Sequence, residues 1–300
     1  MHPLKKIRGV LEYDEDDNEQ GVRRIYLYTS NRSFHVYTEK QQVDLIESQH
    51  WGQMLFLDGC LQSTTRDEIM YHNALVHPLM DVIQSKNNVL ILGGGEGATA
   101  REVLRWNVEL VTMVDYDKEL VDLMKVQGYK WSQGAFNDKR LKVYYDDAWE
   151  FMKEAVKNKL QYDAIILDLT DPNLLRDKWL DLLKMVFQCL KLSTGGFVMN
   201  AGLYVAWNTS KLNIIKNMIE SLCLEYPQFK YYIYTIYIPS FNGEWAFIVL
   251  ANKKKFMLDP KYLNIIPSWI RRSINTLENE CINSSANTLP SLTNISALYA

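Results

Sequence analysis

Between residues 88 and 199, short apolar runs alternate with stretches long enough to hold a helix, and this alternation constrains the fold more than any other feature. The runs occupy residues 89–92, 110–114, 141–145, 164–167 and 196–199. Strands that alternate with helices are typical of a parallel sheet covered by helices on both faces. We therefore predict an α/β architecture for this part of the chain.

Two more strand-like runs follow, at residues 230–238 and 244–250, and only residues 239–243 separate them. That gap is too short for a parallel crossover, so the two runs should form an antiparallel hairpin at the edge of the sheet. A parallel sheet that ends in such a hairpin is the arrangement expected of a domain that binds an S-adenosyl nucleoside. The predicted fold class is therefore the Rossmann-like fold of S-adenosylmethionine-dependent methyltransferases.

The region before residue 86 has a different pattern. Runs rich in Tyr, Val, Ile and Phe occupy residues 24–28, 34–38, 42–46 and 54–57, and Asp58-Gly59 is a hairpin signal. These runs predict antiparallel strands, and helical spacing over residues 66–80 predicts a connecting helix. We expect an N-terminal β domain with that helix at 1–85, a catalytic domain at 86–255, and a helical segment (262–277) and polar tail within 256–300.

Composition excludes several classes of protein. The net charge is −3, with 33 basic and 36 acidic residues, and 47% of the residues are hydrophobic. Such a chain is neither disordered nor a basic nucleic-acid binder, and no apolar run is long enough for a membrane helix. The start of the sequence leads into an acidic run at residues 14–17, so we expect no signal peptide and a cytoplasmic location. Four cysteines without CxxC spacing predict reduced thiols.

A glycine-rich loop, Gly93-Gly94-Gly95-Glu96-Gly97, lies between the first apolar run and a helical pattern at 98–106. Such a loop lets a ligand approach the backbone closely. Asp115 ends the next strand, where a carboxylate can accept both hydrogen bonds from a ribose diol. Asp146-Asp147 ends the third strand and suits an adenine amino group. Acids placed there only for solubility are the alternative interpretation.

Glu96 separates this loop from the loops that hold pyrophosphate. Two like charges ~4 Å apart repel by about 1 kcal/mol in water and by more when partly buried. The ligand beside Glu96 is therefore not expected to be an anion, and a nucleoside that carries a cation would suit it.

The fourth strand ends in Asp168-Leu169-Thr170-Asp171-Pro172. Together with Glu96, Asp115 and Asp147, these two acids gather at one edge of the predicted sheet. The cluster requires either a metal or a polycation. No His accompanies the acids, and Mg²⁺ sites usually serve phosphates that this loop would repel, so we favour a polyamine and predict no metal.

Several motifs together resemble the polyamine aminopropyltransferases, the spermidine synthase family. The motifs are residues 57–68, Tyr71-His72, His77-Pro78, residues 93–102, residues 131–136 and residues 168–172. The resemblance runs from about residue 41 to residue 250. The spelling of the glycine loop and of Tyr71-His72 is most similar to the triamine/agmatine and thermospermine synthase branches.

The resemblance implies transfer of an aminopropyl group from decarboxylated S-adenosylmethionine to a polyamine, with methylthioadenosine as the product and no prosthetic group. It implies a homodimer or homotetramer. It places the nucleoside against Gln41, Gly93, Gly95, Glu96, Gly97, Asp115, Asp147 and Ala148. It places the acceptor against Gln62, Tyr71, His72, Glu96, Asp168, Asp171 and Phe241, with Asp168 as the catalytic residue.

Several alternatives stay open at this point. Tyr71 and His72 also suit a packing role, and His72 and His77 are too far apart along a helix to form a metal pair. Phe241 stands where spermidine synthases commonly carry a tyrosine, which makes a preference for putrescine less certain. The acceptor stays open among putrescine, agmatine, spermidine and related amines. Spermine and thermospermine are among the possible products. The segment after Pro172 is short for a lid.

Two other classes of function compete with aminopropyl transfer. An S-adenosylmethionine-dependent N-methyltransferase is disfavoured by Glu96, because the intact donor would bring its carboxylate nearby. A polyamine-binding relative without turnover is disfavoured by the presence of both Asp168 and Asp171.

Overall fold

The computed structural model describes residues 10–17, 21–170 and 176–252. Asp171, the predicted helix at 262–277 and the polar tail therefore lie outside the described residues.

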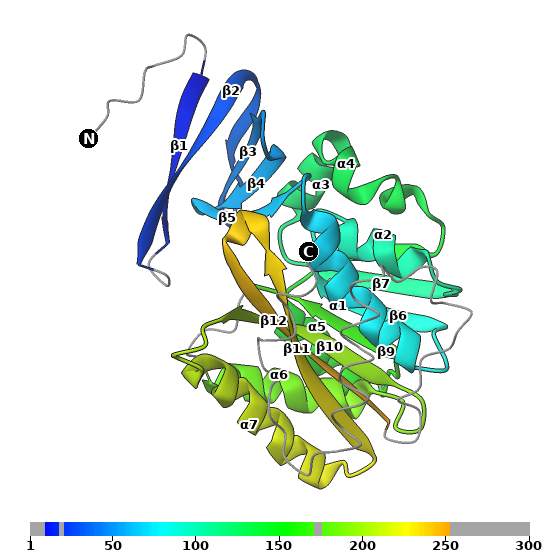
Figure 1. The fold of residues 1–300 in the computed structure, drawn as a ribbon. Coiled ribbons are helices and arrows are strands. Elements are labelled where there is room, and N and C mark those ends of the chain that lie inside the picture. The colour runs from blue at the N-terminus through cyan, green and yellow to red at the C-terminus, as the bar shows by residue number, and fades with distance from the viewer. Residues whose placement is uncertain (1–9, 18–20, 171–175, 253–300) are drawn as a thin grey trace.

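The N-terminal part is a five-stranded sheet in which every strand is antiparallel to its neighbours (Figure 1). The strands, in both chain and spatial order, are β1 (Val10–Asp17), β2 (Val22–Tyr37), β3 (Gln42–Ser48), β4 (Gly52–Leu57) and β5 (Cys60–Thr64). The hairpin at Asp58-Gly59 is confirmed as the turn between β4 and β5. The runs at 24–28 and 34–38 belong to one strand, β2, whose register shifts between Thr29 and Phe34.

Strand β1 is the part of this sheet that the hydrophobic pattern did not predict. Its acids are paired across the hairpin: the Arg23 guanidinium donates to Asp14 with an Nε–Oδ1 distance of 2.7 Å. Glu15 is buried and accepts hydrogen bonds from the Tyr26 hydroxyl and the Leu61 amide, both at 2.7 Å. Cross-strand partners thus allow a strand to form from an acidic segment.

The second sheet has seven strands in the order β11-β12-β10-β9-β6-β7-β8. The strands are β6 (Asn88–Gly93), β7 (Leu110–Asp115), β8 (Leu141–Tyr145), β9 (Ala164–Asp168), β10 (Gly196–Tyr204), β11 (Phe229–Ile238) and β12 (Gly243–Asn252). Strands β6 to β10 pair in parallel, whereas β12 is antiparallel to both β10 and β11. The predicted parallel sheet with an antiparallel hairpin at its edge is confirmed.

Helices cover both faces of the second sheet, while the first sheet lies beside it in blue (Figure 1). The helices are α1 (Glu68–Val82), α2 (Ala98–Leu104), α3 (Lys118–Gln127), α4 (Tyr129–Ser132), α5 (Ala148–Lys157), α6 (Arg176–Cys189) and α7 (Ser210–Glu225), with 3-10 turns η1 (Ala135–Asn137) and η2 (Pro239–Phe241). In the described part of the chain, no helix has the length and apolarity needed to span a bilayer.

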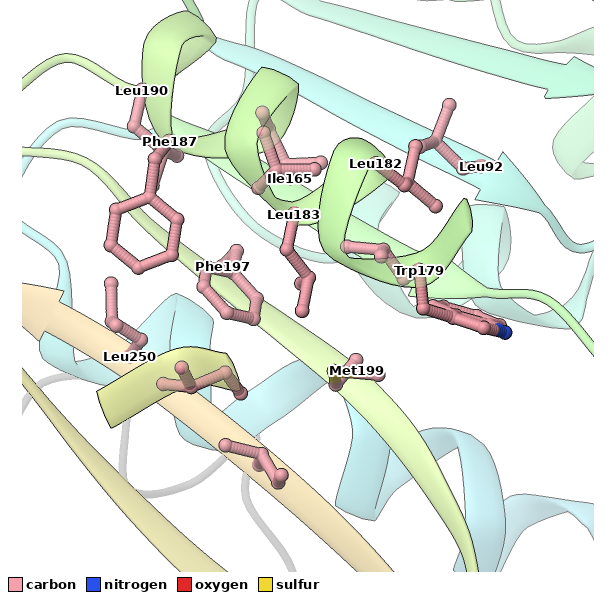
Figure 2. Close-up of a cluster of buried hydrophobic side chains, with 14 of the residues drawn as sticks. Leu92, Ile165, Trp179, Leu182, Leu183, Phe187, Leu190, Phe197, Met199 and Leu250 are labelled. Carbon is pink, nitrogen blue, oxygen red and sulfur yellow. The ribbon is translucent and has the colours of Figure 1, made fainter. Parts of the chain in front are cut away.

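Two apolar clusters hold the helices on the sheet. One packs α1 and α2 against one face, and the other packs α5, α6 and α7 against the opposite face. Figure 2 shows part of the second cluster, where Phe187 of α6 faces Phe197 of β10. Their ring centroids are 5.6 Å apart in an edge-on arrangement, which is favourable for aromatic pairs.

The topology gathers strand ends at one edge of the sheet. Strand β6 lies between β9 and β7, and its end residue Gly93 is in register with Asp168 of β9. Asp115 ends the strand on the other side of β6. In open α/β sheets, ligands bind at this carboxyl edge, next to the point where the strand order reverses.

Candidate active site

The glycine loop follows β6, and its glycines are required by lack of space. Gly93 has φ of 86°, and a Cβ there would lie 2.1 Å from the Asp168 carbonyl oxygen. A Cβ on Gly95 would lie 2.8 Å from Oδ2 of Asp115. The loop therefore passes directly between the two carboxylates that end β7 and β9, and only glycine allows that approach.

Asp115 is the member of the cluster predicted to bind the ribose of the nucleoside. Its side chain is buried, and its Oδ1 accepts a hydrogen bond of 2.9 Å from the Asp117 backbone amide. Burial raises the pKa of Asp115 to about 6, and the nearby charge of Glu96 adds to this effect, although the Asp117 amide opposes it. A carboxylate poised this way gains from a ligand that donates hydrogen bonds to it.

Gln41, just before the start of β3, reaches the same edge through Asp117. The Gln41 amide donates to Asp117 Oδ2 at 2.9 Å, and the Thr38 hydroxyl donates to the same oxygen at 2.8 Å. The Tyr116 hydroxyl donates to the side-chain oxygen of Gln41, Oε1, at 3.3 Å. The segment before β3 thus places a side chain near Asp115, through Asp117.

Asp147 serves as the N-cap of α5. Its Oδ1 accepts from the backbone amides of Trp149 and Glu150, at 2.8 and 3.2 Å. Ala148 is the first residue of that helix and is buried. The cap fixes the strand–helix junction at the predicted adenine position and occupies one carboxylate oxygen of Asp147.

Asp168 is held by two hydroxyl donors. Thr99 of α2 donates to Oδ2 at 2.6 Å, and Tyr71 of α1 donates to Oδ1 at 3.2 Å. The pKa of Asp168 is raised to about 6. Burial is the largest cause and the charge of Glu96 adds to it, while His72 and the two hydroxyl donors act in the opposite direction. Such a carboxylate is a better proton acceptor than an ordinary one.

His72 lies between two carboxylates. Its Nδ1 is 2.7 Å from the Glu68 carbonyl oxygen and 2.9 Å from the Glu68 carboxylate, and its Nε2 is 2.8 Å from Oε1 of Glu96. Burial alone would lower the pKa of His72, but the bonds to Glu68 and Glu96 raise it well above its ordinary value. Arg101 forms two further hydrogen bonds of 2.9 Å with Glu68.

An aromatic wall lies next to Asp168. The Tyr71 ring is edge-on to Phe241 of η2 at 6.2 Å and to Phe247 of β12 at 5.3 Å. Phe241 in turn contacts Trp245 at 4.6 Å. The turn that carries Phe241 is fixed to the start of α1, because the Ser240 amide donates to Asp67 at 2.7 Å.

The structure thus brings together most of the predicted site. Gln62 differs, since its amide donates to the Cys60 carbonyl at 3.1 Å instead of to a member of the acidic cluster. Ligand atoms of His72, Glu96 and Asp168 lie within 4.8 Å of one another, a spacing compatible with a metal. His72 would have to lose a proton and its bond to Glu96 before it could coordinate one, so this donor set does not favour a metal.

Three residues of the site were missed by the sequence analysis: Thr99, Asp117 and Glu68. Thr99 lies just after the glycine loop, and Asp117 lies two residues after a strand-ending acid, so their positions were available signals. Glu68 precedes His72 by one helical turn, a spacing that places both on one face of a helix.

Chemically, this edge can bind cations and accept a proton. Three carboxylates, Asp115, Glu96 and Asp168, line a glycine loop, and an aromatic wall borders one side. An alkylammonium suits carboxylates and aromatic faces alike. The raised pKa of Asp168 suits removal of a proton from such a group.

Comparisons with known proteins identify the family of the chain. Residues 68–260 match the family described as the spermine/spermidine synthase domain. The chain is 36% identical over 232 residues to the polyamine aminopropyltransferase of Aeropyrum pernix, which covers 74% of this chain and 68% of that protein. It is 40% identical over 215 residues to the polyamine aminopropyltransferase of Saccharolobus islandicus, covering 70% and 69% of the two chains.

The fold is similar to that of a solved structure. The crystal structure of spermidine synthase from Thermotoga maritima superposes with a TM-score of 0.75 at 22% identity, covering 94% of this chain and 92% of that one. The similarity extends over both sheets and confirms the predicted fold class.

Proposed function

This chain belongs to the spermine/spermidine synthase family, and from that premise we propose how its residues carry out aminopropyl transfer. In this reaction the aminopropyl group of decarboxylated S-adenosylmethionine moves to a polyamine acceptor, and methylthioadenosine is released. No prosthetic group takes part. The observation that carries our assignment is the position of Asp168, which ends β9 beside the start of the glycine loop and accepts hydrogen bonds from Tyr71 and Thr99.

The donor occupies the side of the site formed by Gln41, Asp115 and Asp147. Asp115 accepts hydrogen bonds from the ribose diol, and Gln41 and Asp147 border the rest of the nucleoside. The donor has no carboxylate, so its aminopropyl end is an ammonium that Glu96 attracts. The same carboxylate repels intact S-adenosylmethionine.

The acceptor approaches from the side of Tyr71 and Phe241, with its attacking nitrogen at Asp168. The neutral amine forms a bond to the methylene carbon next to the sulfonium. The bond from that carbon to sulfur breaks, and its electron pair stays on sulfur as the thioether of methylthioadenosine. Alignment of nitrogen, carbon and sulfur supplies much of the rate.

Asp168 takes the proton that the amine must lose. An alkylammonium has a pKa near ~10.4 and an ordinary Asp near ~3.9, a gap of roughly 6.5 units. The pKa of Asp168, at about 6, narrows this gap. Desolvation of the amine between the aromatic wall and the glycine loop narrows it further, because burial lowers the pKa of an amine.

The identity of the acceptor, the quaternary structure and the cytoplasmic location stay predictions. Phe241 has no hydroxyl that could form a hydrogen bond with a terminal ammonium of the acceptor. Its ring, next to Trp245, instead favours contact with a methylene chain of the acceptor or a cation–π contact with one of its ammonium groups. We therefore propose an acceptor longer than putrescine, such as agmatine or spermidine. From the family resemblance we also propose a homodimer or homotetramer.

The proposal is tested by incubating the protein separately with decarboxylated and intact S-adenosylmethionine, each with putrescine, agmatine and spermidine. Mass spectrometry then identifies the amine products. We expect aminopropylated amine and methylthioadenosine with the decarboxylated donor only. A methylated amine with the intact donor would instead support an N-methyltransferase, and binding of methylthioadenosine without any product would support a non-catalytic relative.

A further inference from the structure

The His72 ring is buried beside the acidic cluster, and each of its two nitrogens faces a carboxylate of the protein. Both acceptors near Nδ1 belong to Glu68, one a carbonyl oxygen and one a carboxylate oxygen. Neither can donate a proton, so Nδ1 must carry one. Nε2 faces the Glu96 carboxylate at 2.8 Å, and it must also carry a proton if Glu96 is ionised.

The balance of charges around the ring favours the doubly protonated form. Glu68 already has a cationic partner, because Arg101 contacts both of its carboxylate oxygens at 2.9 Å. The charge on His72 is therefore available to Glu96. The His72 side chain is 3% exposed and that of Glu96 is 14% exposed, so water screens this pair weakly.

Asp168 gives this arrangement its importance for the reaction. Glu96 and Asp168 are two acids of one cluster, and the charge of Glu96 makes ionisation of Asp168 less favourable. Donor binding requires a negative Glu96, and proton removal from the acceptor requires a negative Asp168. A cation beside Glu96 reduces the repulsion that would otherwise keep one of the two acids protonated.

We propose that His72 is a positioning residue for aminopropyl transfer: as an imidazolium held between Glu68 and Glu96, it orients the Glu96 carboxylate and lets Glu96 and Asp168 be ionised together. This inference rests on the proposed function of Glu96 and Asp168 and assigns His72 a role other than substrate contact. The groups that face the cluster are Glu68 and Tyr71 of α1, Glu96 of the loop, Thr99 and Arg101 of α2, and Asp115 of β7.

A first test reads the ring directly. In protein labelled with ¹⁵N-histidine, the His72 signals are assigned by their loss in His72→Gln, and their chemical shifts report the protonation of each nitrogen. We expect both nitrogens to stay protonated from pH 6 to pH 8. In Glu96→Gln the ring should lose its Nε2 proton at a lower pH than in the wild type. A ring that is neutral at pH 7 in the wild type would overturn the proposal.

A second test reads the reaction. The pH profile of kcat/KM for the decarboxylated donor is measured at saturating amine for the wild type, His72→Gln, Glu96→Gln and the double variant. We expect the acidic limb of the His72→Gln profile to move up by about one pH unit, because an opposite charge within ~4–6 Å shifts a pKa by one unit or more. With the pKa of Asp168 at about 6, this move should lower the rate about threefold near pH 6.5, approaching tenfold below pH 6, and very little near pH 9.

The double variant separates positioning from packing. If His72 acts through Glu96, adding His72→Gln to Glu96→Gln should cost less than about threefold. His77→Gln is the matched control, since His77 is buried on the same helix and contacts Glu102 instead of the cluster. An unshifted acidic limb, or fully additive losses, would overturn the proposal.

The two tests also distinguish this inference from the proposed function. If the wild type formed no product with any amine, the proposed function would fail, and the NMR signals would still report the state of His72. If the wild type were active while its His72 ring was neutral, only the role of His72 would fail.

Discussion

Two buried histidines on α1 show how one residue type is used in two opposite ways. His72 contacts two carboxylates in the active site, and its pKa is raised well above its ordinary value despite burial. His77 lies in the packed interior, where its Nε2 contacts Glu102 at 2.9 Å and its Nδ1 accepts from the Trp106 indole at 3.0 Å. Burial lowers the pKa of His77, and Glu102 only partly opposes this.

The carboxylates near the two histidines also differ in the direction of their pKa shifts. Glu102 has His77, Arg101 and Arg105 as partners; burial raises its pKa, but the hydrogen bond to His77 and the two guanidinium groups lower it to about 2. Burial and the neighbouring charge of Glu96 raise the pKa of Asp168 to about 6, although its hydroxyl donors and His72 oppose this rise. The interior pairs Glu102 with side chains of the protein, whereas we propose that a substrate cation is the partner of Asp168.

The largest expected effect comes from Asp168→Asn, which removes the least compensated charge. We expect turnover to fall by at least about 10³-fold, because general base catalysis typically contributes 10²–10⁴-fold. Methylthioadenosine binding, measured by calorimetry, should change by less than about threefold. Substantial residual turnover would show that Asp168 is not the catalytic residue.

The same variant should also be more stable at high pH. A folded-state pKa of about 6 for Asp168 lies above the ordinary value of 3.8, so protonation favours the fold and that stability is lost as the pH rises through 6. Asp168→Asn should therefore unfold at pH 8 with a free energy equal to or up to about 2 kcal/mol above that of the wild type. Chemical denaturation at pH 8 and pH 5 measures this difference.

Glu96→Gln should give the next largest effect. The amide keeps the shape of the side chain but loses the attraction for the donor ammonium, so KM for decarboxylated S-adenosylmethionine should rise by roughly 10- to 100-fold. Discrimination against intact S-adenosylmethionine should shrink, as measured by competitive displacement of methylthioadenosine. Glu119→Gln is a control, because Glu119 lies in the first turn of α3 and accepts from the Glu39 amide.

A smaller effect separates the two histidines by pH. The stabilisation from His72 is present below its unfolded pKa of ~6.5 and is lost only as the pH rises toward the folded pKa, whereas that from His77 is present above ~6.5 and is lost as the pH falls. The destabilisation by His72→Gln should therefore be larger at pH 6 than at pH 8.5, and that by His77→Gln larger at pH 8.5. We expect differences of about 1 kcal/mol in urea unfolding. If the destabilisation by the two substitutions changed with pH in the same way, the proposed difference between His72 and His77 would be wrong.

The smallest effect is expected at the aromatic wall. Phe241→Tyr adds a hydroxyl beside Tyr71 and should shift the acceptor preference toward putrescine by a few-fold, since a hydrogen bond to a charged group contributes about 1.5 kcal/mol or more only when well aligned. Product ratios from mixed amines measure the shift. Phe247→Tyr, at a fully buried position, is a control that should lower stability instead.

The sequence predicted the parallel sheet and its edge hairpin because buried strands there are continuous apolar runs. It did not predict β1, whose acids look solvent-exposed until Arg23 and Arg24 of β2 are placed opposite them. The strand-ending acids were predicted because topology alone brings Asp115 and Asp168 to one edge. The contact between His72 and Glu96 was not, because it depends on where α1 crosses the sheet, and sequence spacing carries no information on that crossing.

Helix α1 has a consequence for how this protein can be divided. It precedes the first strand of the second sheet, and a boundary at residue 86 would assign it to the N-terminal half. Yet it supplies Tyr71 and His72, and it packs against one face of the second sheet. Because the proposed nucleoside site also includes Gln41, we expect a minimal catalytic module to need the N-terminal sheet as well as α1.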